Sequence, residues 1–124
     1  MQWLICFSGL PGVGKSTIAE ALARDTGALW LRIDRIEDAM RASHMVTADL
    51  ADGGYAAAQA VAGAALEQGF DVVADCVNPI ALTRAAWRDV SQQARARHLD
   101  VCLTCEAAEH RRRLEARWRP GLPD

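Results

Sequence analysis

The residues with the most specific chemistry lie near the amino terminus, where positions 9–16 read GLPGVGKS and a threonine follows. This segment fills every fixed position of the phosphate-binding pattern G-x-x-x-x-G-K-[ST]. In such a loop, glycines let backbone N–H groups point at a phosphate, the lysine reaches the β- and γ-phosphates, and the hydroxyl binds Mg²⁺. The sequence therefore predicts a nucleotide phosphate site formed by Gly9, Gly12, Val13, Gly14, Lys15, Ser16 and Thr17.

The lysine of this segment stands out in the composition of the whole chain. Lys15 is the only lysine among the 14 lysines and arginines. A compact ammonium on a flexible stem can do what a planar guanidinium cannot, namely act as a mobile point charge among phosphate oxygens. We therefore predict that Lys15 is a catalytic cation.

Two carboxylates, Asp34 and Asp75, follow the apolar segments 28–33 and 70–75. Ligands of open α/β sheets bind at the carboxyl ends of the strands, so both side chains are expected to face the phosphate loop. One carboxylate there can hold Mg²⁺, and another can accept the proton of an attacking hydroxyl. We assign Asp34 to the acceptor hydroxyl and Asp75, with Ser16, to Mg²⁺. The reverse assignment stays open, as do a helix-cap role for Asp34 and a turn role for Asp75.

The absence of two sequence motifs narrows the classes of reaction that the chain could catalyse. A guanine-reading N-K-x-D motif needs a second lysine, which the chain lacks. No glutamate follows Asp75 to polarise a water molecule, as motor-type ATPases would require. Phosphoryl transfer to a bound acceptor therefore fits better than GTP or ATP hydrolysis.

The elements that must position these residues alternate along the chain. Apolar runs predict strands at 3–7, 28–33, 70–75 and 99–105, and helical patterns predict helices at 16–24, 35–43, 55–68, 81–96 and 107–119. Strands that alternate with helices indicate an α/β fold, in which helices cover both faces of a parallel sheet. A chain of 124 residues is expected to form one such domain, residues 1–124.

The helix expected at 107–119 is strongly basic. Arginines that close over a transferring phosphoryl group stabilise its developing charge, so we predict a lid that carries Arg113 and Arg117. Pairs such as Arg111 with Glu115 would instead suit an ordinary solvated helix surface. A nucleic-acid patch is the third interpretation, and the net charge of −2 argues against it.

The remaining composition favours a cytoplasmic protein. No apolar run approaches the length of a membrane span, and the amino terminus does not read as a signal peptide. Cys102 and Cys105 match C-x-x-C, the pattern of a redox pair or half a zinc site. In a strand, however, residues three apart face opposite sides, so we interpret the cysteines as structural.

Residues 9–17 together with LRID at 31–34, VAD at 73–75, Asn78 and RLEAR at 113–117 resemble the small P-loop kinases that phosphorylate metabolites. That group includes adenylylsulfate kinase, gluconate kinase, chloramphenicol phosphotransferase and the zeta-type toxins. The resemblance implies a P-loop NTPase fold of three α/β/α layers, a sheet in the order 2-3-1-4-5, and ATP with Mg²⁺ as the donor. It also implies a lid in which the first arginine packs near adenine and the second contacts phosphate.

One departure concerns the carboxyl terminus. Members of the group continue into a fifth strand, an adenine-contacting loop and a final helix, whereas this sequence ends at Asp124. We therefore expect a truncated sheet in the order 2-3-1-4, whose open edge would invite a homodimer. The predicted function is ATP- and Mg²⁺-dependent phosphoryl transfer to a small hydroxylated metabolite. The alternatives are a non-catalytic ATP-binding module or truncated regulatory form, and a polynucleotide 5′-kinase.

Overall fold

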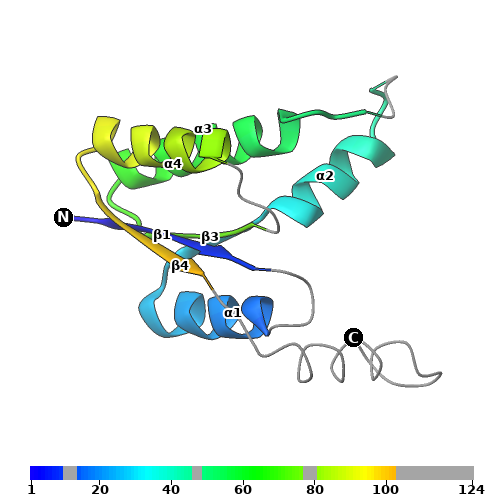
Figure 1. Ribbon diagram of the computed structural model, residues 1–124. Coiled ribbons are helices and arrows are strands. Elements are labelled where there is room, and N and C mark those ends of the chain that lie inside the picture. The colour runs from blue at the N-terminus through cyan, green and yellow to red at the C-terminus, as the bar shows by residue number, and fades with distance from the viewer. Residues whose placement is uncertain (10–13, 46–48, 77–80, 103–124) are drawn as a thin grey trace, which may run out of the picture.

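The computed structural model describes residues 1–9, 14–45, 49–76 and 81–102, with side chains from residue 83 onward in the last range. Its four strands are β1 (Trp3–Ser8), β2 (Leu29–Arg32), β3 (Val72–Asp75) and β4 (Arg97–Cys102). All pairings are parallel and the order is β2-β3-β1-β4, as predicted. The helices are α1 (Lys15–Thr26), α2 (Ile33–Ala42), α3 (Gly53–Glu67) and α4 (Ala81–Gln93). Figure 1 shows α1 below the sheet and α3 and α4 above it, so the expected three layers are present.

Strand β3 is the most enclosed strand, since all four of its residues are buried. It lies between β2 and β1, and a continuous apolar run is what a parallel sheet covered on both faces requires. Its last residue, Asp75, pairs in register with Phe7 of β1 and Arg32 of β2. The backbone of this carboxylate is therefore fixed by neighbours on both sides.

Alternation along the strands gives the molecule two separate hydrophobic cores. On the upper face, Leu4 and Cys6 of β1 pack with Trp87 and with alanines of α3. On the lower face, Phe7 and Val73 pack with alanines of α1. Because successive strand residues point to opposite faces, each side chain of β1, β3 and β4 belongs to one of these two layers.

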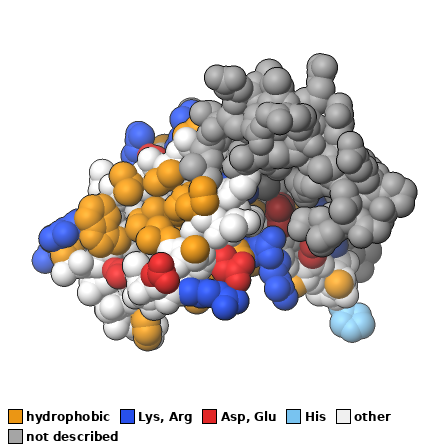
Figure 2. Space-filling view, turned by 90° about the horizontal axis from the view of Figure 1, so that it is seen from below, with side chains coloured by type: hydrophobic (Ala, Val, Ile, Leu, Met, Phe, Trp, Pro, Cys, Tyr) orange, Lys and Arg blue, Asp and Glu red, His pale blue; other side chains and the backbone are white. Residues whose placement is uncertain are grey.

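Part of the lower face carries exposed hydrophobic side chains, which gather in one region of Figure 2. Leu99 is 46% exposed, and it lies on this face because it pairs with Ile5, which packs against the lower core. None of the helices in the described part of the chain is long and apolar enough to cross a membrane.

Several predicted boundaries were wrong. Helix α4 ends at Gln93, three residues before its predicted end, and β4 starts at Arg97, two residues before its predicted start. The chain turns sharply between them because Arg95 has a φ of 56°. Ile33 opens α2 and does not close β2, since its buried side chain reaches the core from the first turn of that helix. The helix predicted at 55–68 begins two residues earlier, at Gly53.

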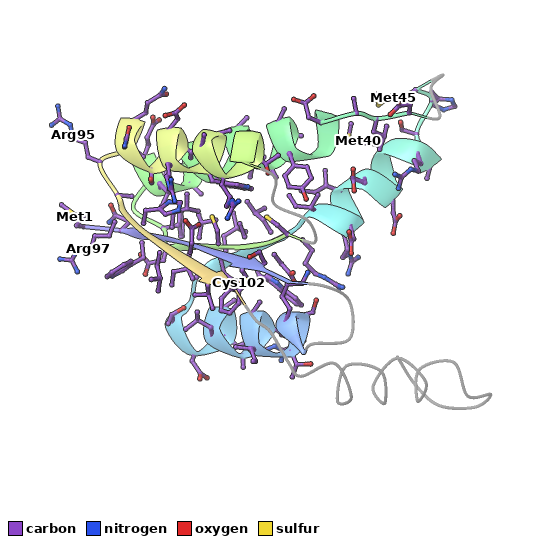
Figure 3. All side chains as sticks on the ribbon, viewed as in Figure 1. Met1, Met40, Met45, Arg95, Arg97 and Cys102 are labelled. Carbon is purple, nitrogen blue, oxygen red and sulfur yellow. The ribbon has the colours of Figure 1, made fainter. Side chains whose placement is uncertain are left out.

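The two glycines that open α3 allow α2 to approach closely. A Cβ on Gly53 would lie 3.2 Å from Cε of Met40, a side chain that Figure 3 places on α2 beside the start of α3. A Cβ on Gly54 would lie only 2.5 Å from Cγ of Glu37. These glycines therefore set the distance between the two helices.

The α2–α3 contact predicts opposite effects for two substitutions in the same helix. Gly54→Ala should lower the free energy of unfolding by about 1–3 kcal/mol, because the new methyl group overpacks against Glu37. Gly63→Ala should raise it by about 0.5–1 kcal/mol, since its Cβ would meet Val90 at an ordinary 3.8 Å and glycine is a poor helix former. Urea unfolding of both variants measures the difference. Equal effects would contradict a close contact at Gly54.

Candidate nucleotide-binding site

A buried ion pair lies at the centre of the site. Nζ of Lys15, at the start of α1, is 2.7 Å from Oδ1 of Asp75, at the end of β3. Only 8% of the lysine side chain and 3% of the aspartate side chain are exposed. Two buried charges are tolerated when each compensates the other, so neither residue can be considered alone.

The neighbouring residue, Ser16, completes this arrangement. Its hydroxyl donates a hydrogen bond of 2.9 Å to Oδ2 of Asp75. The two carboxylate oxygens of Asp75 therefore have different partners, the ammonium of Lys15 and the hydroxyl of Ser16. The sequence predicted that Ser16 and Asp75 act together, and the structure brings them into direct contact.

These oxygen atoms suit a magnesium ion. Mg²⁺ prefers carboxylate and hydroxyl oxygens, and it usually takes one or two carboxylates together with water and substrate phosphates. Asp75 and Ser16 offer such donors 2.9 Å apart at the amino-terminal end of a helix. The residues present therefore fit Mg²⁺, and their role as its ligands stays a prediction.

The backbone on either side of the phosphate loop has the expected shape. Gly9 has a φ of 149° and Gly14 a φ of 85°, both in the region that favours glycine. Gly14 caps the amino-terminal end of α1, where unpaired N–H groups and the helix dipole attract a phosphate. Thr17 is exposed in the first turn of the same helix.

The surroundings of Asp34 differ from those of the ion pair. It is the second residue of α2 and is exposed, whereas Asp75 is buried. The sequence placed Asp34 after the second strand, either as a free strand-end acid or as a helix cap. The N-cap position is in fact occupied by Arg32, so Asp34 lies within the first helical turn.

Arg32 is a residue of this edge that the sequence analysis missed. It closes β2 directly beside Asp75 in the sheet, and its guanidinium carbon lies 5.1 Å from the centre of the Trp30 ring. It therefore adds a cation to the carboxyl edge of the sheet. The sequence signal that could have identified Arg32 is its position near the end of the apolar segment 28–33.

Several predicted site residues lie outside the described part of the chain. These are Gly12, Val13, Arg113 and Arg117, together with the whole lid-like helix expected at 107–119.

The comparisons with known proteins agree with this geometry. A family model described as an AAA domain (AAA_33) matches residues 4–123. The chain belongs to this family. No curated protein is similar enough in sequence to match. Solved structures that match include P-loop kinases, so this AAA-domain chain has the P-loop kinase fold that its motifs predicted.

Three solved structures illustrate the likeness. The APS kinase of Mycobacterium tuberculosis, in complex with AMPPNP and APS, is 24% identical with a TM-score of 0.74, over 97% of this chain and 75% of that chain. A gluconokinase from Sinorhizobium meliloti is 23% identical with a TM-score of 0.62, over 95% and 65%. A chain of the Pnkp1/Rnl/Hen1 RNA repair complex is 21% identical with a TM-score of 0.67, over 94% and 37%. The first kinase structures that match are only partly covered, by 65% and 70% of their length.

The ion pair predicts that shortening two basic side chains, Lys15 and Arg24, has very different effects on the free energy of unfolding. Lys15→Met should lower the free energy of unfolding by about 3–5 kcal/mol, because it leaves the buried carboxylate of Asp75 without its cation. Arg24→Met breaks a pair with Glu20 that is equally short, 2.7 Å, but 78% and 40% exposed, and should cost at most about 0.5 kcal/mol. Denaturant titrations measure both. Similar losses would show that the Lys15–Asp75 pair is not buried in solution.

Cys76, the residue after Asp75, is expected to react more slowly with thiol reagents than Cys102. Burial, and next the negative charge of Asp75, raise the pKa of Cys76 to about 12. A thiol is reactive as the thiolate, so Cys76 should resist alkylation at pH 8 while the exposed Cys102 reacts. Peptide mapping after a short iodoacetamide treatment measures both. Labelling of Cys76 as fast as that of Cys102 would mean that the end of β3 opens.

Proposed function

We propose that this protein transfers the γ-phosphoryl group of ATP to a hydroxyl group of a small metabolite. The observation that carries the proposal is the contact of Ser16 with the buried pair of Lys15 and Asp75, at the end of a glycine-rich loop. Phosphoryl transfer depends mainly on positioning and on electrostatic stabilisation, and this set offers a mobile cation and hard oxygen donors at one point.

The proposal gives each residue of the site a role. When ATP enters, Lys15 exchanges Asp75 for the phosphate oxygens, and the N–H groups at the start of α1 bind the same phosphates. Ser16 and Asp75 would hold Mg²⁺, which would neutralise charge on the phosphates. Arg113 and Arg117 close over the nucleotide as a lid.

The acceptor side of the proposal depends on the difference between the two carboxylates. Asp75 is buried and paired, whereas Asp34 is exposed in the first turn of α2 and free to meet an incoming molecule. Asp34 accepts the acceptor's hydroxyl proton as the new oxygen–phosphorus bond forms and the bond to ADP breaks. The solved relatives support small acceptors, since one is an APS kinase and another a gluconokinase.

An acceptor screen tests the proposal. The chain is incubated with Mg-ATP and single acceptors, namely gluconate, other sugar acids and sugars, adenylylsulfate, and an oligonucleotide with a 5′-hydroxyl, and ADP release is measured. At least one small hydroxylated compound should raise ADP release above the background. Asp34→Asn should then lower kcat by about 10²–10⁴-fold, which is the usual loss for a catalytic base.

A matched control separates the role of Asp34 from general damage to the helix. Asp38 is exposed in the same helix and pairs with Arg41 at 3.6 Å, so Asp38→Asn should leave kcat unchanged. Equal activity of both variants would contradict Asp34 as the base. Transfer to the oligonucleotide alone would favour a polynucleotide 5′-kinase, and ATP binding without transfer to any acceptor would favour a non-catalytic module.

A further inference from the structure

A cluster of three different metal-binding side chains lies on the upper face of the sheet, away from the nucleotide site. It consists of Cys6 on β1 and His98 and Asp100 on β4, and the ligand atoms all lie within 4.8 Å of one another. Parallel register makes Cys6 the direct neighbour of Asp100, and His98 the neighbour of Leu4. Figure 3 marks Arg97 and Cys102 at the two ends of β4, so the cluster lies along the middle of this strand.

The hydrogen bonds around His98 fix the orientation of its ring. The hydroxyl of Ser91, in α4, donates to the carbonyl oxygen of Arg88 at 2.8 Å. The same hydroxyl oxygen lies 3.1 Å from Nδ1 of His98. In a neutral imidazole only one nitrogen carries a proton, so Nε2 offers a lone pair to a metal ion in the tautomer that is protonated on Nδ1.

The other ring nitrogen faces a carboxylate. Nε2 of His98 lies 2.9 Å from Oδ1 of Asp100. Nε2–H can donate a hydrogen bond to this oxygen, and in the other tautomer Nε2 and Oδ1 can bind the same metal ion. The thiol of Cys6, which is 7% exposed, provides a third donor at the same point.

We propose that Cys6, His98 and Asp100 bind one zinc ion. Sulfur, imidazole and carboxylate form a donor set that suits Zn²⁺, whereas Mg²⁺ prefers oxygen alone. Tetrahedral zinc separates its ligand atoms by roughly 3.3–3.8 Å, so shifts of about 1 Å would close the cluster around the ion. Asp100 is 34% exposed, which leaves the fourth position to solvent.

The residues around the three ligands support this assignment. A histidine that binds a metal usually donates its other N–H to a neighbouring oxygen, and the Ser91 hydroxyl, 3.1 Å from Nδ1 of His98, is placed to accept it. The second oxygen of Asp100 lies 3.4 Å from the guanidinium of Arg88. The ion would tie β4, one of the two edge strands of the described sheet, to β1. It lies on the opposite face of the sheet from Lys15 and Asp75, so it is separate from the magnesium of the proposed reaction.

Zinc and cobalt titrations of the whole chain test the proposal. Isothermal titration calorimetry should show one saturable Zn²⁺ site, and Co²⁺ should produce the near-ultraviolet absorption of a cobalt–thiolate bond. Cys6→Ser should abolish this absorption, and Ser91→Ala should weaken Zn²⁺ binding by about 10–100-fold, as expected for a residue that orients a ligand. Circular dichroism confirms that each variant is folded.

Two controls keep the proposal falsifiable. Cys102 is exposed and belongs to the C-x-x-C pattern, so Cys102→Ser should bind Zn²⁺ and Co²⁺ like the wild type. His98→Gln should lose the Co²⁺ absorption even if Cys6→Ser fails to fold. Absence of Zn²⁺ binding by the wild type, or binding lost in Cys102→Ser and kept in His98→Gln, would overturn the proposal.

Discussion

The structure depends on how two opposite charges are kept inside the protein at the carboxyl edge of the sheet. Lys15 and Asp75 are far apart in sequence, yet each is buried and each would be costly without the other. Asp75 is held by strands on both sides, and Lys15 is held by the first turn of α1. This pair holds a cation at the place where the sequence predicts a nucleotide phosphate.

The parallel sheet lets one set of strands serve two kinds of chemistry. Side chains of β3 that face α1 end in Asp75 and belong to the nucleotide site. Side chains of β1 and β4 that face α4 include the cluster of Cys6, His98 and Asp100. The period of two along a strand separates these groups, although both arise from neighbouring strands.

Much of the site could be predicted from the sequence because its residues obey local rules. The glycine-rich motif identified Lys15 and Ser16, and the strand-end rule identified Asp75. Asp34 was harder to place, because a buried isoleucine continued the apolar run into the helix that follows. The cluster around His98 depends on the register between β1 and β4, which spacing within one segment cannot reveal. Thus the sequence supported the interpretation of Cys6 as structural, and only the pairing of the strands brings it beside His98 and Asp100.

Calorimetry of Mg-ATP binding to the wild-type chain and to Lys15→Arg tests the central claim most directly. Arginine keeps a positive charge beside Asp75, but its planar guanidinium cannot replace an ammonium among phosphate oxygens. The wild type should bind Mg-ATP saturably, Lys15→Arg should bind at least about tenfold more weakly, and the exposed Arg24→Lys should bind like the wild type. Equal affinity of Lys15→Arg and the wild type, or no binding by the folded wild type, would contradict the account.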